Sequence, residues 1–382
     1  MTRSADKKDT EFDVIVCGAG MVGAALARGL LGRGLRVLVL DGADSDFRAA
    51  KANFGLVWVQ GKGFNNPDYQ RLSHQAARLW PAFAADLSAE TGIDLQYENR
   101  GGLNFCMGEA QWQSRAERMA QWHAQAPDIN ACTEMLERPA LARLLPGIRL
   151  GDAVSGASFG HTDGHVNPLR LLAALQHSIV LRQGRLIHGQ AVARIAPLTG
   201  GGFEVHSHNA RYRAPRVVIA AGLGSQALGA MVGLDVPLRA QRGQILVTER
   251  LAPFMPFPAS GIRQTGEGSV MVGLTHEEVG LDLSTTTDAA VRMSRNAIRT
   301  LPQLAHAKWV RQWSCLRIMT PDGCPVYAES TMFPGATVAL CHSGVTLAAF
   351  HAGPMADALD APRWPAELDF FHHGRFDVPQ TA

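Results

Sequence analysis

A glycine-rich turn between two apolar runs near the N-terminus constrains the fold of this chain more than any other segment. The first run covers residues 12–17, FDVIVC, and the turn that follows is GAGMVG, from Gly18 to Gly23. A stretch rich in small residues leads to a second apolar run, residues 36–40, which ends at Asp41. This order of strand, glycine turn, helix, strand and acidic residue is the βαβ pattern of a dinucleotide-binding site.

Each part of this pattern has a physical role. Gly18 permits the tight turn, Gly20 lets the backbone approach a pyrophosphate, and Gly23 lets the helix pack closely on the strand. The helix N-terminus offers free N–H groups and a positive dipole end to phosphates, and Asp41 can accept hydrogen bonds from ribose hydroxyls. The pattern does not distinguish NAD from FAD. The residues expected at the dinucleotide are Gly18, Ala19, Gly20, Met21, Val22 and Asp41.

Composition and charge narrow the classes of function. The chain has 382 residues, 46% of them hydrophobic, which allows a large core and predicts two domains. Lys and Arg number 36 against 34 Asp and Glu, so the net charge of +2 does not indicate a nucleic-acid partner. The polar start, MTRSADKKDTEFD, and the lack of a long apolar run predict a cytoplasmic protein without a transmembrane segment. The six cysteines form no CxxC pair, which favours reduced thiols.

Local signals predict where helices and strands begin. Asn66-Pro67-Asp68 and Asn167-Pro168 each indicate a helix start, because Asn can cap a helix and Pro suits its first position. Residues 95–97 have a short strand pattern. His161 and His165 lie four residues apart in a glycine-containing loop, and we do not expect them to bind a metal.

Two later segments extend the nucleotide-binding pattern. Strand signals between residues 185 and 213 precede another buried strand, residues 216–222, which we expect to return to the first sheet. An inserted β-rich segment is typical of an ADP site shared by a large flavin. Near the C-terminus, strand 337–341 leads through His342-Ser343-Gly344-Val345-Thr346 into an apolar helix. This turn repeats the first arrangement, since a helix N-terminus again offers free N–H groups to a ligand.

Five segments in this order resemble the D-amino acid oxidase superfamily of FAD enzymes, which includes glycine oxidase and sarcosine oxidase. They are GAGMVG with Asp41, VVIAAGLGSQAL from Val217 to Leu228, Gln241-Arg242-Gly243-Gln244, Arg317 with TPDGCP from Thr320 to Pro325, and HSGVTL from His342 to Leu347. The resemblance implies FAD and an α/β fold, in which a Rossmann-type domain similar to that of glutathione reductase accompanies a β-rich α+β substrate domain. Both are expected to be discontinuous: residues 1–85, 151–235 and 315–382 for FAD, and residues 86–150 and 236–314 for the substrate.

Within the superfamily, three segments look most like the flavin subunits of hydroxyproline dehydrogenases and of hydrogen cyanide synthase. These segments are residues 52–55, residues 57–61 and TPDGCPVY, from Thr320 to Tyr327. Such subunits usually belong to larger enzymes that pass electrons onward instead of to dioxygen. The resemblance implies a small amino or imino acid as substrate, with D-hydroxyproline or D-proline favoured. It allows partner flavin or iron–sulfur subunits as electron acceptors.

The resemblance also assigns roles to single residues. The family reaction oxidises a C–N bond by hydride transfer to flavin N5, so the protein mainly orients the substrate. Arg317 stands at the position that binds the substrate carboxylate in related amine oxidases, and its guanidinium would form a bidentate clamp. A structural salt bridge is the alternative for Arg317, and Arg242 is a weaker candidate for the clamp. His342 could stabilise the reduced flavin, line the pocket, or be an ordinary core histidine.

Further residues are expected around the cofactor and the substrate. Backbone N–H groups of residues 344–347 would face the flavin carbonyls, where negative charge grows on reduction. Met271, Gly273 and Thr275 are expected to cover the substrate, and covalent attachment of the flavin through Cys341 or His342 stays open. The remaining cofactor-binding residues expected are Asn53, Phe54, Gly55, Val192, Ala221, Gly222, Gly344, Val345, Thr346 and Leu347.

Three functions therefore remain open. The chain could be an FAD-dependent amino- or imino-acid dehydrogenase. It could be an oxidase that makes peroxide from glycine, sarcosine or a D-amino acid. The third alternative is a subunit for assembly and electron relay that is inactive without its partner.

Overall fold

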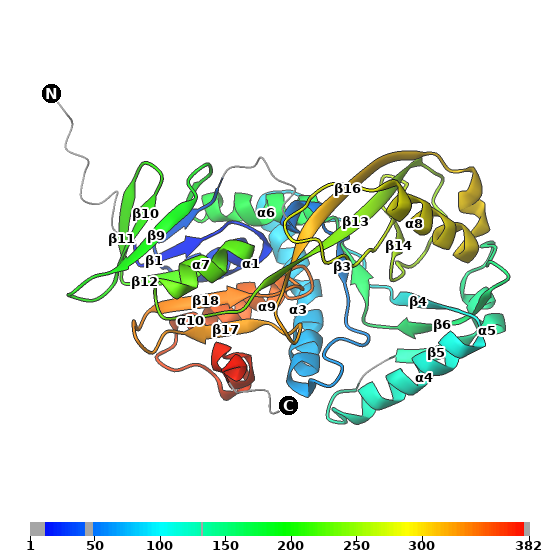
Figure 1. The fold of residues 1–382 in the computed structure, drawn as a ribbon, viewed down its shortest axis with the longest axis horizontal. Coiled ribbons are helices and arrows are strands. Elements are labelled where there is room, and N and C mark those ends of the chain that lie inside the picture. Colours follow the sequence, from blue (N-terminus) through cyan, green and yellow to red (C-terminus); the bar gives the residue numbers. More distant parts are fainter. Residues whose placement is uncertain (1–11, 43–48, 131–132, 378–382) are drawn as a thin grey trace.

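A six-stranded sheet forms the centre of one part of the protein, at the left of Figure 1. The computed structural model describes residues 12–42, 49–130 and 133–377. The sheet has the order β17-β18-β12-β1-β2-β8, in which all strands except the edge strand β17 run parallel. The strands are β1 (Val14–Cys17), β2 (Val37–Leu40), β8 (Arg185–Ile187), β12 (Arg216–Ile219), β17 (Val326–Glu329) and β18 (Ala336–Leu340).

Both faces of this sheet are covered, which explains why its strands are apolar throughout. Val14 and Val16 of β1 join a core cluster with helices on one face. Ile15 and Cys17 point the other way, into a second cluster with a three-stranded sheet and α7. The helices of the first face are α1 (Met21–Leu31), α3 (Pro67–Thr91) and α6 (Pro168–Leu181). The elements of the second are α7 (Ser225–Ala230), β9 (Val192–Pro197), β10 (Phe203–Ser207) and β11 (Arg211–Ala214).

A second, β-rich part lies beside the first, at the right of Figure 1. Its antiparallel sheet has the order β14-β15-β13-β16, and α8 (Thr287–Thr300) packs on one face. The other face carries Ile245 and Met271, which pack against Phe54 from the first part. The strands are β13 (Arg239–Arg250), β14 (Ile262–Gln264), β15 (Ser269–Val272) and β16 (Trp309–Met319).

A three-stranded sheet, β4-β6-β5, and two helices complete this part. They are β4 (Gly102–Met107), β5 (Thr133–Glu137), β6 (Val154–Gly160), α4 (Glu109–Ala124) and α5 (Arg138–Leu144). The predicted α/β fold with a Rossmann-type sheet and a second β-rich part is thus confirmed. Strand β6 pairs here although the domain boundary expected at residue 151 assigns it to the FAD-binding domain. The division into domains remains a prediction.

The predicted helix starts differ in how they are capped. Asn167 caps α6, because its side chain accepts hydrogen bonds from the N–H groups of Leu169 and Arg170. Asn66 precedes α3 without such a bond, although Pro67 takes the first helical position as expected. Residues 95–97 form no strand, since Gln96 has a φ of 51°, which interrupts an extended conformation.

The apolar helix expected near the C-terminus contains a wider turn. It consists of α9 (Ala348–Phe350), the π-helical turn His351–Met355, which contains Pro354, and α10 (Ala356–Asp360). The π turn packs against α1 at Gly29, where a Cβ atom would lie 2.4 Å from the carbonyl oxygen of Ala352. Glycine at this position therefore lets the two helices touch through their backbones.

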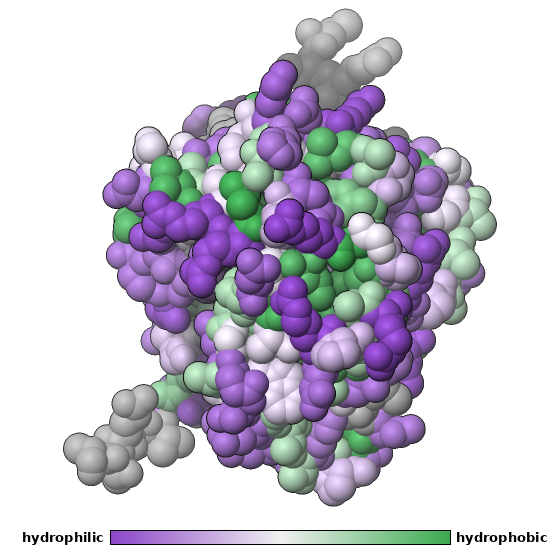
Figure 2. All heavy atoms as spheres, turned by 90° about the vertical axis from the view of Figure 1, so that its right-hand side faces the viewer, coloured by the Kyte–Doolittle hydropathy of each residue, from purple (hydrophilic) through white to green (hydrophobic). Residues whose placement is uncertain are grey.

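One face of the protein carries exposed hydrophobic side chains. The face at the right of Figure 1 carries hydrophobic side chains near its centre, with hydrophilic ones around them (Figure 2). Among the described residues, no helix combines the length and apolar character of a membrane span. Five cysteines are described, all buried and free, and Cys132 lies outside the described residues.

Candidate functional site

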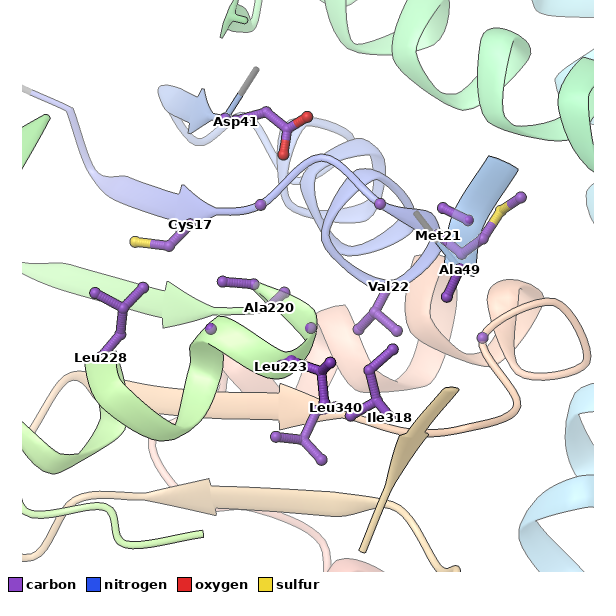
Figure 3. Close-up of a pocket in the computed structure, with 18 of the residues that line it drawn as sticks. Cys17, Met21, Val22, Asp41, Ala49, Ala220, Leu223, Leu228, Ile318 and Leu340 are labelled. Carbon is purple, nitrogen blue, oxygen red and sulfur yellow. The ribbon is translucent and has the colours of Figure 1, made fainter. Parts of the chain in front are cut away.

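A cavity of about 600 Å³ opens at the carboxyl ends of β1, β2 and β12 (Figure 3). This is the edge at which ligands bind to open parallel sheets. In Figure 3, the apolar side chains of Val22, Leu223, Ile318 and Leu340 gather on one side of the glycine turn, and Asp41 lies on the other. The predicted residues that line the cavity are Gly18, Gly20, Met21, Val22, Asp41, Asn53, Val192, Ala221, Gly222, His342, Gly344 and Val345.

The three glycines of the first turn have the geometry expected for their roles. Gly18 has a φ of +106°, and a Cβ atom there would lie 2.4 Å from the carbonyl oxygen of Ala220. A Cβ atom on Gly23 would lie 2.0 Å from the carbonyl oxygen of Gly18, so helix and strand could not pack as they do. A Cβ atom on Gly20 would have the Cβ of Ala50 as its nearest neighbour, at 3.7 Å, so the backbone of Gly20 is open to the cavity.

Asp41 lies at the end of β2 and is tied to the glycine turn. Its Oδ1 accepts a hydrogen bond of 3.1 Å from the N–H of Ala19, and its Oδ2 lies 3.9 Å from Nδ1 of His188. The N–H of Ala19 is therefore engaged by the carboxylate and is not available to a phosphate. Ala19 thus positions Asp41, whose side chain lines the cavity together with Val192.

A second group of backbone donors comes from the turn that follows β18. The N–H groups of Gly344, Val345 and Thr346 have no hydrogen-bond partner among the described residues, and Gly344 and Val345 line the cavity. The N–H of Leu347, in contrast, donates to the carbonyl oxygen of Ser343 at 3.0 Å. The turn therefore offers three donors to a ligand, from residues 344–346, and not the four that the sequence suggested.

Thr346 holds this turn in place. Its carbonyl oxygen accepts a hydrogen bond of 2.8 Å from the indole of Trp80, and its hydroxyl accepts one of 3.2 Å from the N–H of Trp58. The three donors are thus fixed before a ligand arrives, which reduces the entropy lost on binding.

The segment Asn53-Phe54-Gly55 contributes one residue to the cavity and two to its support. Asn53 lines the cavity, donates to the carbonyl oxygen of Ala50 at 2.9 Å, and accepts from the N–H of Gly55 at 2.9 Å. Phe54 is buried against the β-rich part. Gly55 has a φ of +80°, and a Cβ atom there would lie 2.4 Å from the carbonyl oxygen of Val166. Phe54 and Gly55 therefore shape the position of Asn53.

Arg317 is a buried cation that forms no ion pair with any described residue. It is 8% exposed and lies on β16. Its neighbours Leu316 and Ile318 line the cavity; Arg317 itself does not, but it lies close enough to His342, which does, to lower the pKa of that imidazole. Its Nη1 lies 3.4 Å from Oε1 of Gln241 and 3.4 Å from the carbonyl oxygen of Arg242, both long for hydrogen bonds. Among the described residues, its buried Nη2 has no hydrogen-bond partner and no carboxylate forms an ion pair with the guanidinium. A buried charge is costly unless it is paired, so this guanidinium suits an anionic ligand.

The other candidates of the β-rich part are engaged in the fold itself. Arg242 forms ion pairs with Glu277, at 2.6 Å, and with Asp282. Thr275 accepts a hydrogen bond of 2.9 Å from the N–H of Gln244, and Met271 packs in the apolar cluster of Phe54. The cavity is not lined by Thr275, Met271 or Arg242.

His342 lines the cavity as a neutral group. Burial, together with the nearby cations Lys62 and Arg317, lowers the pKa of His342 to about 3. Its imidazole therefore carries no charge at neutral pH with which to stabilise an anionic ring. Burial raises the pKa of the Cys341 thiol to about 12, so this group is protonated and a poor nucleophile for covalent attachment.

Lys62 is a functional candidate that the sequence did not indicate. Its ammonium group donates to the hydroxyl of Ser343, which also accepts a hydrogen bond of 2.8 Å from Tyr69. Burial lowers the pKa of Lys62 to about 8, so the group is still mostly charged at neutral pH. Lys62 thus places a positive charge beside the second turn, in addition to that of Arg317. No local signal identifies it, because residue 62 is 281 positions from its partner.

These features fit FAD. The glycine turn and Asp41 would hold the ADP end, since they combine an open backbone with a carboxylate. The N–H groups of residues 344–346 suit the carbonyls of the ring, and Lys62 adds positive charge near them. The apolar lining between the two ends suits the extended body of the cofactor.

The comparisons with known proteins agree with this geometry. A family model described as FAD dependent oxidoreductase (DAO) matches residues 13–358. One of the subunits of the opine oxidase of Agrobacterium tumefaciens is 39% identical over 373 residues, which cover 97% of this chain and 100% of that protein. Hydrogen cyanide synthase subunit HcnC of Pseudomonas aeruginosa is 26% identical and covers 97% of this chain and 98% of its own length.

The fold has a counterpart among solved structures. Glycine oxidase of Geobacillus kaustophilus superimposes with a TM-score of 0.88 at 24% identity, and the match covers 96% of this chain and 99% of that one. The resemblance that the sequence motifs indicated is confirmed. The chain belongs to the DAO family of FAD-dependent oxidoreductases.

Proposed function

We propose that this chain is the flavin subunit of an enzyme that oxidises the C–N bond of an amino acid whose nitrogen carries a second carbon substituent. An opine is the favoured substrate, because the opine oxidase relative matches over its whole length. The observation that carries the proposal is the buried guanidinium of Arg317, whose Nη2 has no partner among the described residues. It can form the charged hydrogen bonds that an amino acid carboxylate requires.

The residues of the chain would divide the work as follows. FAD supplies the hydride acceptor, its N5 atom. Arg317 would hold the carboxylate and thereby fix the position of the α-carbon, and the closely packed site would exclude water. The low pKa of His342 makes its imidazole a poor base, so the substrate would bind with its amine unprotonated. Lys62 and the N–H groups of residues 344–346 would stabilise negative charge as it grows on the ring.

A narrower expectation from the sequence, D-hydroxyproline or D-proline, stays an alternative. A proline nitrogen also carries two carbon substituents, so Arg317 would serve either substrate in the same way. Glycine, sarcosine and D-amino acids with release of peroxide form the other alternative.

A partner is part of the proposal. The opine oxidase and hydrogen cyanide synthase relatives both carry the word subunit in their names. A second chain with a flavin or an iron–sulfur cluster would accept electrons from this one. A cytoplasmic location also stays a prediction from the sequence.

Anaerobic bleaching of the flavin tests the proposal directly, since it needs no electron acceptor. The FAD-loaded chain would be mixed with N-(1-carboxyethyl)arginine, D-hydroxyproline, D-proline, sarcosine or glycine. We expect the N-substituted arginine to reduce the flavin fastest. Arg317→Met should weaken substrate binding strongly, whereas Arg311→Met, an exposed arginine on the same strand, should not. Faster reduction by glycine than by every secondary amine would refute the proposal.

A further inference from the structure

The segment Thr275–Glu277 runs beside β13, on the edge opposite β16. Arg242 and Glu277 exchange both backbone hydrogen bonds, at 2.9 and 3.0 Å, so they form a directly opposed antiparallel pair. Their side chains form an ion pair and therefore lie on the same face. Thr275 meets Gln244 through its hydroxyl, which fixes the same register.

This register places His276 on the face that carries Arg317. Neighbouring residues of a strand point to opposite faces, so Gln241 and Gly243 face away from Arg242. The hydrogen bond of 2.7 Å between Gln241 and Glu278 agrees with this assignment. His276 is thus opposite Gly243 on one edge of β13. On the other edge, β16 pairs Arg317 with Gln241 and Cys315 with Gly243.

Gly243 lets the Arg317 guanidinium lie across β13. A Cβ atom on Gly243 would be 2.3 Å from Nη2 of Arg317 and 2.6 Å from its Cζ. The planar group therefore occupies the space that a side chain at this position would fill, and it extends over β13 toward the edge where His276 lies. His276 is exposed, whereas Arg317 is buried, so the pair runs from the surface inward toward His342, which lines the cavity and whose pKa both groups lower.

The acidic residues nearby already have partners. Glu277 binds Arg242 on the opposite face, and Glu278 binds Arg239 and Gln241. Arg317 contributes to lowering the pKa of His276, after burial, which indicates that the two groups lie close enough to repel each other when both are charged. His342 from the turn after β18 faces the same pair and adds no negative charge. The face thus has two basic groups and no unpaired carboxylate among the described residues.

We propose that Arg317 and His276 bind the two carboxylates of one dicarboxylate substrate, an amino acid that carries a carboxyalkyl group on its nitrogen. The inference rests on the proposed function and specifies its substrate class. Arg317 holds the carboxylate of the carbon that is oxidised. His276, at the exposed end, holds the carboxylate of the nitrogen substituent and so selects dicarboxylates over secondary amines with a single carboxylate.

Binding of two thioethers tests this inference separately from oxidation. Thiodiacetate and (methylthio)acetate differ by one carboxylate, and neither has a C–N bond to oxidise. Their dissociation constants would be measured from the flavin absorbance change in the FAD-loaded chain. We expect thiodiacetate to bind at least about tenfold more tightly, as one charged hydrogen bond implies. The ratio should fall toward one in His276→Met, recover in part in His276→Gln, and stay unchanged in His306→Met, a control at an exposed histidine.

The outcomes distinguish the dicarboxylate site from the proposed oxidation. An equal affinity for both thioethers in the unmodified chain, or an unchanged ratio in His276→Met, overturns the dicarboxylate site. Flavin reduction by N-ethylalanine together with such a result leaves the proposed oxidation of secondary amines intact. A thiodiacetate preference that depends on His276, without flavin reduction by N-(1-carboxyethyl)alanine or N-ethylalanine, supports the anion site and refutes the proposed reaction.

Discussion

The substitution Gly243→Ala tests the placement of Arg317 most sharply, because it shifts the position of the guanidinium without removing the group. The added Cβ atom would lie 2.3 Å from Nη2 of Arg317, about 1 Å inside normal van der Waals contact. Gly243 is in the strand β13 and does not have a positive φ, so the backbone accepts alanine. The guanidinium must therefore move by roughly 1 Å, which is enough to misalign a bidentate pair with a carboxylate.

Loss of that alignment should cost about 1.5–3 kcal/mol, the range for hydrogen bonds to charged groups. The apparent dissociation constant for substrate, measured by stopped-flow flavin reduction, should then rise by about 10- to 150-fold. FAD content and thermal stability should change little. Gly200→Ala is the matched control, since an added Cβ atom there would meet nothing within 4 Å. Unchanged substrate affinity in Gly243→Ala would refute the role of Arg317 as the carboxylate clamp.

Three further predictions concern the cofactor and the pH dependence of stability. Asp41→Ala should raise the dissociation constant for FAD by about 10- to 150-fold, measured by titration of the apoprotein; Asp41→Asn should lose less, and equal binding would reject the ribose role. Lys62→Met should lower the flavin midpoint potential by about 30 mV or more, because a cation near the ring favours its reduced form, whereas the exposed control Lys308→Met should leave it unchanged. Burial lowers the pKa of His351 from 6.5 to about 3, so its contribution to stability is complete above pH 6.5 and is lost as the pH falls toward 3. His351→Gln should therefore reduce the slope of unfolding free energy against pH by about 1.4 kcal/mol per unit between pH 6 and 4, measured by urea unfolding, and an identical slope would contradict this.

Local patterns predicted the parts of the fold that depend on local physics. Gly18 and Gly23 follow from the shape of a βαβ turn, and the cap at Asn167 follows from a side chain that reaches its own helix. Asn66 has the same sequence signal, yet it makes no capping bond. The sequence shows that a cap is available but not whether the approaching chain lets it form.

The candidate site could be predicted from the sequence only in part. Arg317 was predicted from a family motif. Its neighbours Gln241 and Gly243 are uncharged, and they lie beside its guanidinium only because β13 pairs with β16. Lys62 and His276 were missed for the same reason. Their partners lie on other strands and turns, and no periodicity in the sequence brings these together. Thr275 was expected at the substrate, whereas its hydroxyl fixes the register that brings His276 beside Arg317.

The backbone contact between Gly29 and Ala352 has a consequence for how the protein meets its cofactor. Helix α1 begins at the glycine turn that starts at Gly18, and the π-helical turn follows the second turn, residues 342–347, so this contact fixes the positions of the two turns relative to each other. The distance between the two turns is therefore set before the cofactor binds. We therefore expect FAD, which is long enough to reach both turns, to bind more tightly than a shorter nucleotide that reaches only one of them.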